Sequence, residues 1–150
     1  MKHQSLDDLA PIAEIVSFGP ESKTMSRSER LERWAAALER HERRLTPLQR
    51  VEFLPKEVRT TARADGSPME VAYRDPILRA EGLAGDRFGD AMEFFALTQK
   101  EAHHVLCDCH YHGTMTGKAV ASRLHSYARR STSDGVWKRA YAAMIARWMQ

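Results

Sequence analysis

The stretch from Thr98 to Gly113, TQKEAHHVLCDCHYHG, most restricts how this chain can fold. Thr98, with Glu101 three residues later, has the pattern of a helix capping box. Gly113 suits the left-handed conformation in which many helices end. The same stretch holds both cysteines and four of the seven histidines. The sequence therefore predicts a central helix over 98–113 that carries most of the reactive side chains.

The helical period assigns a direction to each side chain of this predicted helix. At 100° per residue, one apolar face is formed by Ala102, Val105, Leu106 and Cys109. Cys109 lies near the middle of this face and His104 points away from it. We therefore expect Cys109 to be buried and His104 to be more exposed. The two cysteines face roughly 160° apart on the helix, so they cannot form a disulfide with each other.

Similar signals predict helices along the rest of the chain. Helix starts are expected at Ser5, Ser28, Pro47, Pro68, Gly85 and Thr116. The second helix would place Leu31, Trp34, Ala35, Leu38 and Leu45 on one face. The helix from Thr116 would end at a turn over Ser131–Gly135, and an amphipathic last helix would carry Trp137, Tyr141, Met144 and Trp148.

The segment 58–73 is open to two interpretations. Asp65-Gly66 is typical of a hairpin turn between two short strands. Ser67-Pro68-Met69-Glu70 instead combines a capping box with a proline at the first helical position, which favours a helix from Pro68. That helix would restart at Asp75-Pro76 and end at Gly82. We expect an all-α fold in a single compact domain of six to eight helices over 26–150. An N-terminal helix and a linker over 1–25 would precede this domain.

Composition limits the class of protein. Hydrophobic residues make up 43% of the chain, which is enough for the core of one soluble domain of 150 residues. No apolar run approaches the roughly 18 residues of a membrane span, and the first residues lack the apolar core of a secretory signal. With no disulfide expected, the sequence predicts a cytoplasmic protein without a membrane partner.

The last third of the chain is basic. From Thr114 onward there are seven basic residues and one acid, Asp134. Such a segment suits an acidic partner such as nucleic acid, although the solvated face of two helices has the same composition. The candidate nucleic-acid contacts are Lys118, Arg123, Arg129, Arg130, Lys138 and Arg139.

A sequence pattern gives a second reason to consider DNA. Leu97-Thr98-Gln99-Lys100-Glu101, with Val105-Leu106, Gly113, Val120-Ala121 and Leu124, resembles the first two helices of a response-regulator-type helix-turn-helix. The resemblance implies that the following turn and last helix supply DNA recognition. The chain departs from that pattern because the helix from Thr116 is long and the last helix presents Trp and Met.

The histidines and cysteines of 98–113 also predict a metal site. On a helix, His103 and Cys107 are four residues apart, and Cys107 and His110 are three apart, so either pair can hold one ion. The candidate ligands are His103, Cys107 and His110, and mixed thiolate and imidazole ligands favour zinc. One helix supplies only two ligands, so the others must come from elsewhere. The alternative is that these histidines make only local hydrogen bonds.

No pattern of a known catalytic centre is present. Gly113 to Ala119 has three residues between its glycines where a phosphate-binding loop needs four. Cys107 in the interior of a helix would lack the features that activate a nucleophilic thiol. We expect a small, non-enzymatic regulatory or interaction protein with a protein partner, or a homo-oligomer formed through the aromatic last helix. The alternatives are a DNA-binding regulator and a zinc-binding protein.

Overall fold

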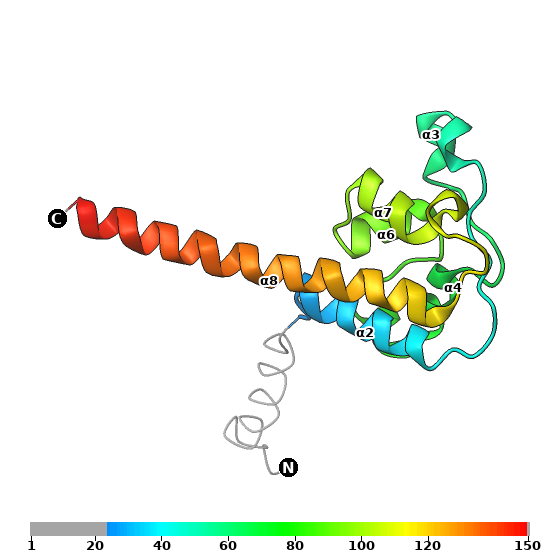
Figure 1. Ribbon diagram of the computed structural model, residues 1–150, viewed down its shortest axis with the longest axis horizontal. Coiled ribbons are helices and arrows are strands. Elements are labelled where there is room, and N and C mark those ends of the chain that lie inside the picture. The colour runs from blue at the N-terminus through cyan, green and yellow to red at the C-terminus, as the bar shows by residue number, and fades with distance from the viewer. Residues whose placement is uncertain (1–23, 150) are drawn as a thin grey trace, which may run out of the picture.

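The computed structural model describes residues 24–149, except for the side chains of 131–138, and is built from helices throughout this range (Figure 1). The predicted all-α class is confirmed, because the described residues contain no strand beyond one isolated β-bridge. The helix and linker predicted over 1–25, including the capping box at Ser5, lie outside the described residues but for the last two positions.

Seven α-helices and two 3-10 helices make up this range, in line with the six to eight helices predicted. They are α2 (Arg27–Glu39), η2 (Val51–Phe53), α3 (Lys56–Arg59), α4 (Pro68–Arg74), α5 (Pro76–Ala80), α6 (Phe88–Phe94), α7 (Gln99–Leu106), η3 (Asp108–His110) and α8 (Gly117–Trp148).

Helix α2 begins two residues earlier than the sequence predicted. Ser26, rather than Ser28, is the N-cap, and its hydroxyl and the Glu29 carboxylate form a reciprocal capping box. The Ser28 side chain instead donates to the carbonyl of Ala128 in α8. Helix α2 ends at Glu39, so Leu45 is buried in the segment after the helix and not on its face.

Local signals were more accurate between residues 66 and 82. Ser67 caps α4 and Pro68 is its first residue, so the helix prediction is confirmed and no hairpin forms across 58–73. Asp75 separates α4 from α5 and accepts a hydrogen bond from the backbone N–H of Ile77. Gly82 has a φ of 116° just after α5. The single short helix predicted from Pro47 is wrong, because 46–50 is not helical and only η2 and α3 follow.

The core lies where α2 packs along the first half of α8, with α4, α6 and α7 around this pair (Figure 1). Trp34 of α2 is fully buried and stacks on Phe95 with ring centroids 4.4 Å apart. Its indole N–H donates to the carbonyl of Pro68 at 2.9 Å. A buried aromatic with its polar atom satisfied ties α2 to the start of α4 and to the end of α6.

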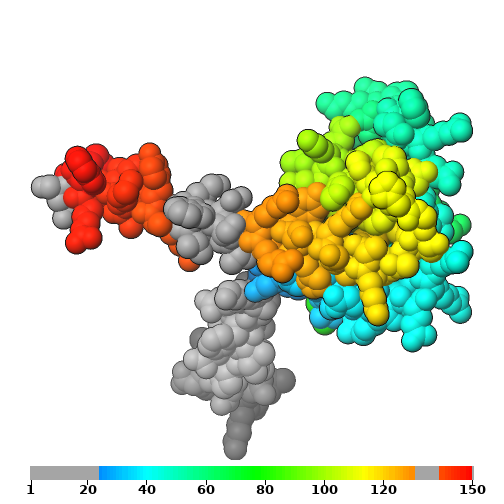
Figure 2. Space-filling view, viewed as in Figure 1, coloured from blue at the N-terminus to red at the C-terminus, as the bar shows by residue number. Residues whose placement is uncertain are grey.

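Helix α8 continues through the turn predicted at Ser131–Gly135, so that prediction is wrong. Ser, Thr, Asp and Gly each cost a helix at most about 1 kcal/mol relative to Ala, and no proline interrupts this segment. The C-terminal part of α8 consequently extends away from the other helices, as Figures 1 and 2 show. None of the described helices is long and apolar enough to span a membrane.

Candidate functional site

The reactive side chains meet where α7 ends. Cys107 has extended dihedral angles, φ −99° and ψ 146°, and its backbone forms a parallel bridge with Leu48. In this bridge the N–H of Leu48 donates to the carbonyl of Leu106, and the N–H of Asp108 donates to the carbonyl of Leu48. The helix predicted over 98–113 therefore starts as expected after Thr98 but stops at Leu106.

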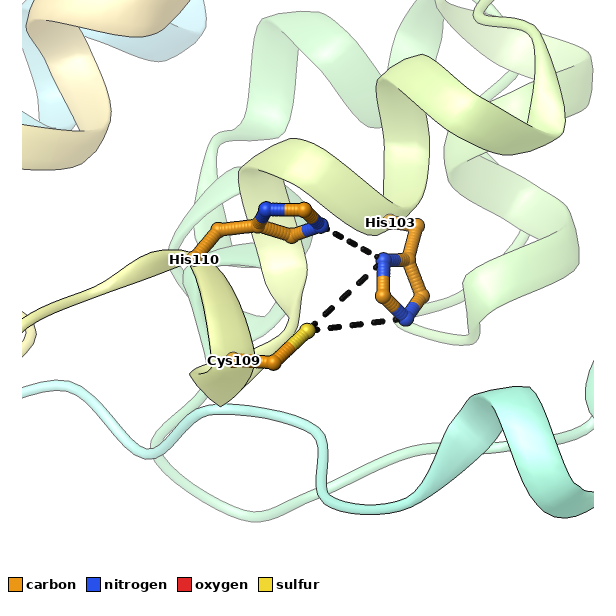
Figure 3. A group of neighbouring side chains, drawn as sticks. All are labelled: His103, Cys109 and His110. Atoms are coloured by element: carbon orange, nitrogen blue, oxygen red, sulfur yellow. Dashed lines mark hydrogen bonds between the residues drawn. The ribbon is translucent and has the colours of Figure 1, made fainter.

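After the bridge, η3 turns the chain back toward α7. Its last two residues, Cys109 and His110, point toward His103 of α7 (Figure 3). The distance from His103 Nδ1 to His110 Nε2 is 2.8 Å, and the Cys109 sulfur lies 3.9 Å from both ring nitrogens of His103. One potential ligand atom from each residue lies within 4.8 Å of the others. We call this set the His/Cys cluster.

Because of this bridge, the burial of the two cysteines is the opposite of what the sequence predicted. Cys107 is fully buried in the core, whereas Cys109 is exposed, so the prediction that Cys109 is buried is wrong. His104 is partly buried and hydrogen-bonds through Nδ1 to the Tyr127 hydroxyl at 2.7 Å, so it is not the more exposed residue. Burial raises the pKa of the Cys107 thiol to about 12, and the nearby Cys109, Glu52 and Asp108 contribute to this increase.

Of the predicted ligands, the structure brings His103 and His110 together and places Cys109 beside them, while Cys107 packs into the core. No local sequence signal distinguishes the two cysteines, because the distinction depends on the pairing with Leu48, 59 positions earlier. Three ligand atoms now come from one short stretch, which a continuous helix could not supply.

No sequence pattern pointed to Glu52, whose carboxylate lies next to the His/Cys cluster. His103 Nε2 lies 3.3 Å from the Glu52 carboxylate, which is carried by η2. A backbone hydrogen bond and the hydrogen bond to His103 hold the pKa of this carboxyl below its ordinary value. Glu52, His103 and His110 also line an open pocket of about 550 Å³ together with Arg59, Gln99 and Lys100.

Arg123 of α8 links the backbone of α7 to that of η3. Its guanidinium donates to the carbonyls of His104 and His110 and lies 3.8 Å from the centre of the Tyr111 ring. The Tyr111 hydroxyl in turn donates to the carbonyl of Val105 at 2.6 Å. These bonds from two sides hold the backbone of η3 against α7, so the ring of His110 is presented by a supported segment.

The electrostatic surroundings favour the neutral form of His110. Burial lowers the pKa of His110, and repulsion of its protonated form by the neighbouring His103 and Arg123 acts in the same direction. Partial desolvation raises the pKa of the Cys109 thiol, with the carboxylates of Glu52 and Asp108 adding to the effect. A thiol with a raised pKa is a poor nucleophile at neutral pH, which argues against covalent catalysis by Cys109.

The six candidate nucleic-acid contacts do not form one patch of equivalent side chains. Arg123 is engaged inside the fold, whereas Lys118, Arg129, Arg130 and Arg139 are exposed along α8. The side chain of Lys138 lies outside the described residues. Because α8 is continuous, the turn and separate last helix that a helix-turn-helix requires are absent from the described residues. Nucleic-acid binding stays a prediction from charge alone.

Comparisons with protein families, with curated proteins and with solved structures found no match to this chain.

Proposed function

We propose that this chain is an interaction protein whose projecting end of α8 binds a second copy of itself. The support comes from residues 139–149, which we call the arm. Every residue of the arm is exposed, and it carries Tyr141, Met144, Ile145 and Trp148, of which Trp148 is 87% exposed. Large apolar side chains gathered on an exposed surface are typical of protein interaction sites.

These four apolar residues fall on one face of the arm. Their spacing of i, i+3, i+4 and i+7 places them in a single stripe at 100° per residue. Arg139 and Arg147 lie roughly 170° and 110° from the middle of this stripe. A helix that packed on the stripe would therefore leave both arginines in water, so their positive charge does not oppose pairing of two arms.

The spacing of the stripe also favours a second copy over an unrelated partner. Successive gaps of three, one and three residues read the same in both directions. In an antiparallel pair, Tyr141 of one arm would face Trp148 of the other, and Met144 would face Ile145. Such self-complementarity is what a two-fold interface requires. Because the arm is only about three turns long, the contact is small and the association weak.

Sedimentation analysis over a range of protein concentrations tests this proposal. We expect the wild-type chain to change from monomer to dimer as concentration rises. Ile145→Glu should abolish dimer formation, because it introduces a charge into the stripe. Ala143→Glu is the matched control, since Ala143 is exposed on the opposite face of the arm, and should associate like the wild type.

Two results would overturn the proposal. The first is a wild-type chain that stays monomeric at every concentration. The second is association that Ile145→Glu leaves unchanged. A wild type that stays monomeric can instead sediment with vesicles of anionic lipid or bind duplex DNA. If Ile145→Glu prevents that binding, the partner of the arm is a lipid surface or DNA and not a second copy of the chain.

A further inference from the structure

We infer that His103, Cys109 and His110 form a zinc site in which Glu52 orients His103. This inference is independent of the arm, which belongs to the C-terminal end of α8, whereas the three ligands lie on α7 and η3. It depends on the positions of the three ligand atoms, on the second hydrogen bond of His103, and on the open side of the cluster.

The distances between the ligand atoms already approach those of a zinc complex. Zinc bonds of ~2.0–2.1 Å to nitrogen and ~2.3 Å to sulfur, at tetrahedral angles, place ligand atoms about 3.3–3.6 Å apart. The nitrogens of His103 and His110 are 2.8 Å apart, and the Cys109 sulfur is 3.9 Å from His103 Nδ1. All three ligand atoms, including those of Cys109 and His110, lie within 4.8 Å of one another. Side-chain rotations that move the nitrogens apart and bring the sulfur closer to both rings therefore accommodate the ion.

Glu52 determines which nitrogen of His103 is available. Its carboxylate accepts a hydrogen bond from Nε2 of His103 when that nitrogen carries the proton. Nδ1, which faces His110 and Cys109, is then free to donate its lone pair to the metal. A carboxylate behind a ligating histidine is the usual arrangement in protein zinc sites, where it fixes the ring and its tautomer. Glu52 is thus a positioning residue and not a ligand.

The remaining coordination position faces solvent. Cys109 is exposed, and His103 and His110 line the open pocket of about 550 Å³. Three protein ligands with one open position differ from a closed structural site, where four protein ligands surround the ion. We therefore expect a single exchangeable ion with water as its fourth ligand. Binding displaces the proton of the Cys109 thiol, which the solvent takes up.

Zinc titration of the full-length, untagged protein tests the site, with a chromophoric chelator as competitor. The wild type should bind one equivalent. Cys109→Ser, His103→Ala and His110→Ala should each lower the affinity at least about 100-fold. Glu52→Ala should lower it about 10- to 100-fold, as is typical when the partner of a ligating histidine is removed. Cobalt(II) should give a thiolate charge-transfer band with the wild type that Cys109→Ser lacks.

Two control variants make the assignment specific. His112→Ala removes an exposed histidine of the same segment, and Cys107→Ala removes the buried cysteine. Both should retain wild-type zinc affinity, and circular dichroism verifies that each variant is folded. The inference is overturned if the wild type binds no stoichiometric zinc, if Cys109→Ser binds as tightly as the wild type, or if Cys107→Ala rather than Cys109→Ser abolishes binding.

Discussion

At Gly117, its first residue, α8 passes close to the backbone at the end of α2. A Cβ atom at this position would lie 2.0 Å from the carbonyl oxygen of Leu38, and backbone atoms cannot move aside as a flexible side chain would. We therefore expect Gly117→Ala to destabilise the fold by about 2–3 kcal/mol or more, because overpacking a rigid contact forces the backbone apart.

Urea unfolding measures this effect. Lys118→Ala is the matched control, since Lys118 is the next residue and exposed, and its free energy of unfolding should change by no more than about 0.5 kcal/mol. Equal stability of the two variants would contradict a close approach of α8 to Leu38.

The spacing of the glycines argued against a phosphate-binding loop at Gly117. It did not show that this residue packs against the end of α2. The same limit of local patterns explains why the burial of the two cysteines was predicted incorrectly. Local periodicity assigned Cys109 to the core and Cys107 to a flank, and the structure reverses them. The cause is a backbone pairing between Leu48 and Cys107, which shifts every later side chain off the helical period. A pairing across 59 positions leaves no trace in a local pattern.

At the scale of elements, His125 of α8 links that helix to α2. Its two ring nitrogens contact the carboxylates of Glu32 and Glu39 at 2.5 and 2.7 Å. The hydrogen bond with Glu39, followed by that with Glu32, raises the pKa of His125 above its ordinary value despite partial burial. The protonated form therefore favours the folded state. This stabilisation is fully present below the unfolded-state pKa of about 6.5 and is lost as the pH rises through the folded-state pKa.

We accordingly expect His125→Gln to lower the free energy of unfolding at pH 5.5 by about 1 kcal/mol or less, the range of partly exposed ion pairs, and by little at pH 9. Thermal unfolding at both pH values measures the difference. His112→Gln, at an exposed histidine, serves as the control and should show no such pH dependence. A loss of stability that is equal at both pH values would indicate packing rather than charge.

Helix starts were predicted correctly where a side chain caps the helix, at Ser67, Thr98 and Thr116. The starts predicted at Ser28, Pro47 and Gly85 were wrong, and α6 begins only at Phe88. Ser67-Pro68 and Thr98 act through side chains that bond backbone groups two or three residues away, so the sequence alone contains the whole interaction. The end of α7 and the continuation of α8 past Ser131 cannot be explained by a side-chain cap. Cys107 leaves the helix for a distant partner, and α8 continues because no single residue is unfavourable enough to stop it.

At the scale of the whole molecule, the described chain has two parts that differ in how far their residues are buried. Among the residues whose burial is described, every buried hydrophobic residue lies within 24–130, whereas every residue of the arm is exposed. The His/Cys cluster belongs to the first part and the apolar stripe to the second. Zinc binding and self-association should therefore be separable, so that Cys109→Ser leaves association unchanged and Ile145→Glu leaves zinc affinity unchanged.

The same division predicts where a protease cuts first. A helix whose residues are all exposed opens locally at little cost, whereas the packed helices open only at a cost that approaches that of global unfolding. Brief trypsin digestion of dilute protein should therefore cleave after Arg139 and Arg147 before it cleaves after Arg33, which pairs with buried Asp75 at 2.7 Å.

Mass spectrometry identifies the order of these cuts, and the shortened chain should keep a thermal unfolding midpoint within a few degrees of the intact protein. Raising the protein concentration should slow the cuts in the arm, because a paired arm opens less often. First cuts after Arg59 or Arg63, or a large fall in the unfolding midpoint after loss of the arm, would contradict this division. The first result would place the weakest part of the fold between α3 and α4, and the second would mean that the arm stabilises the packed helices.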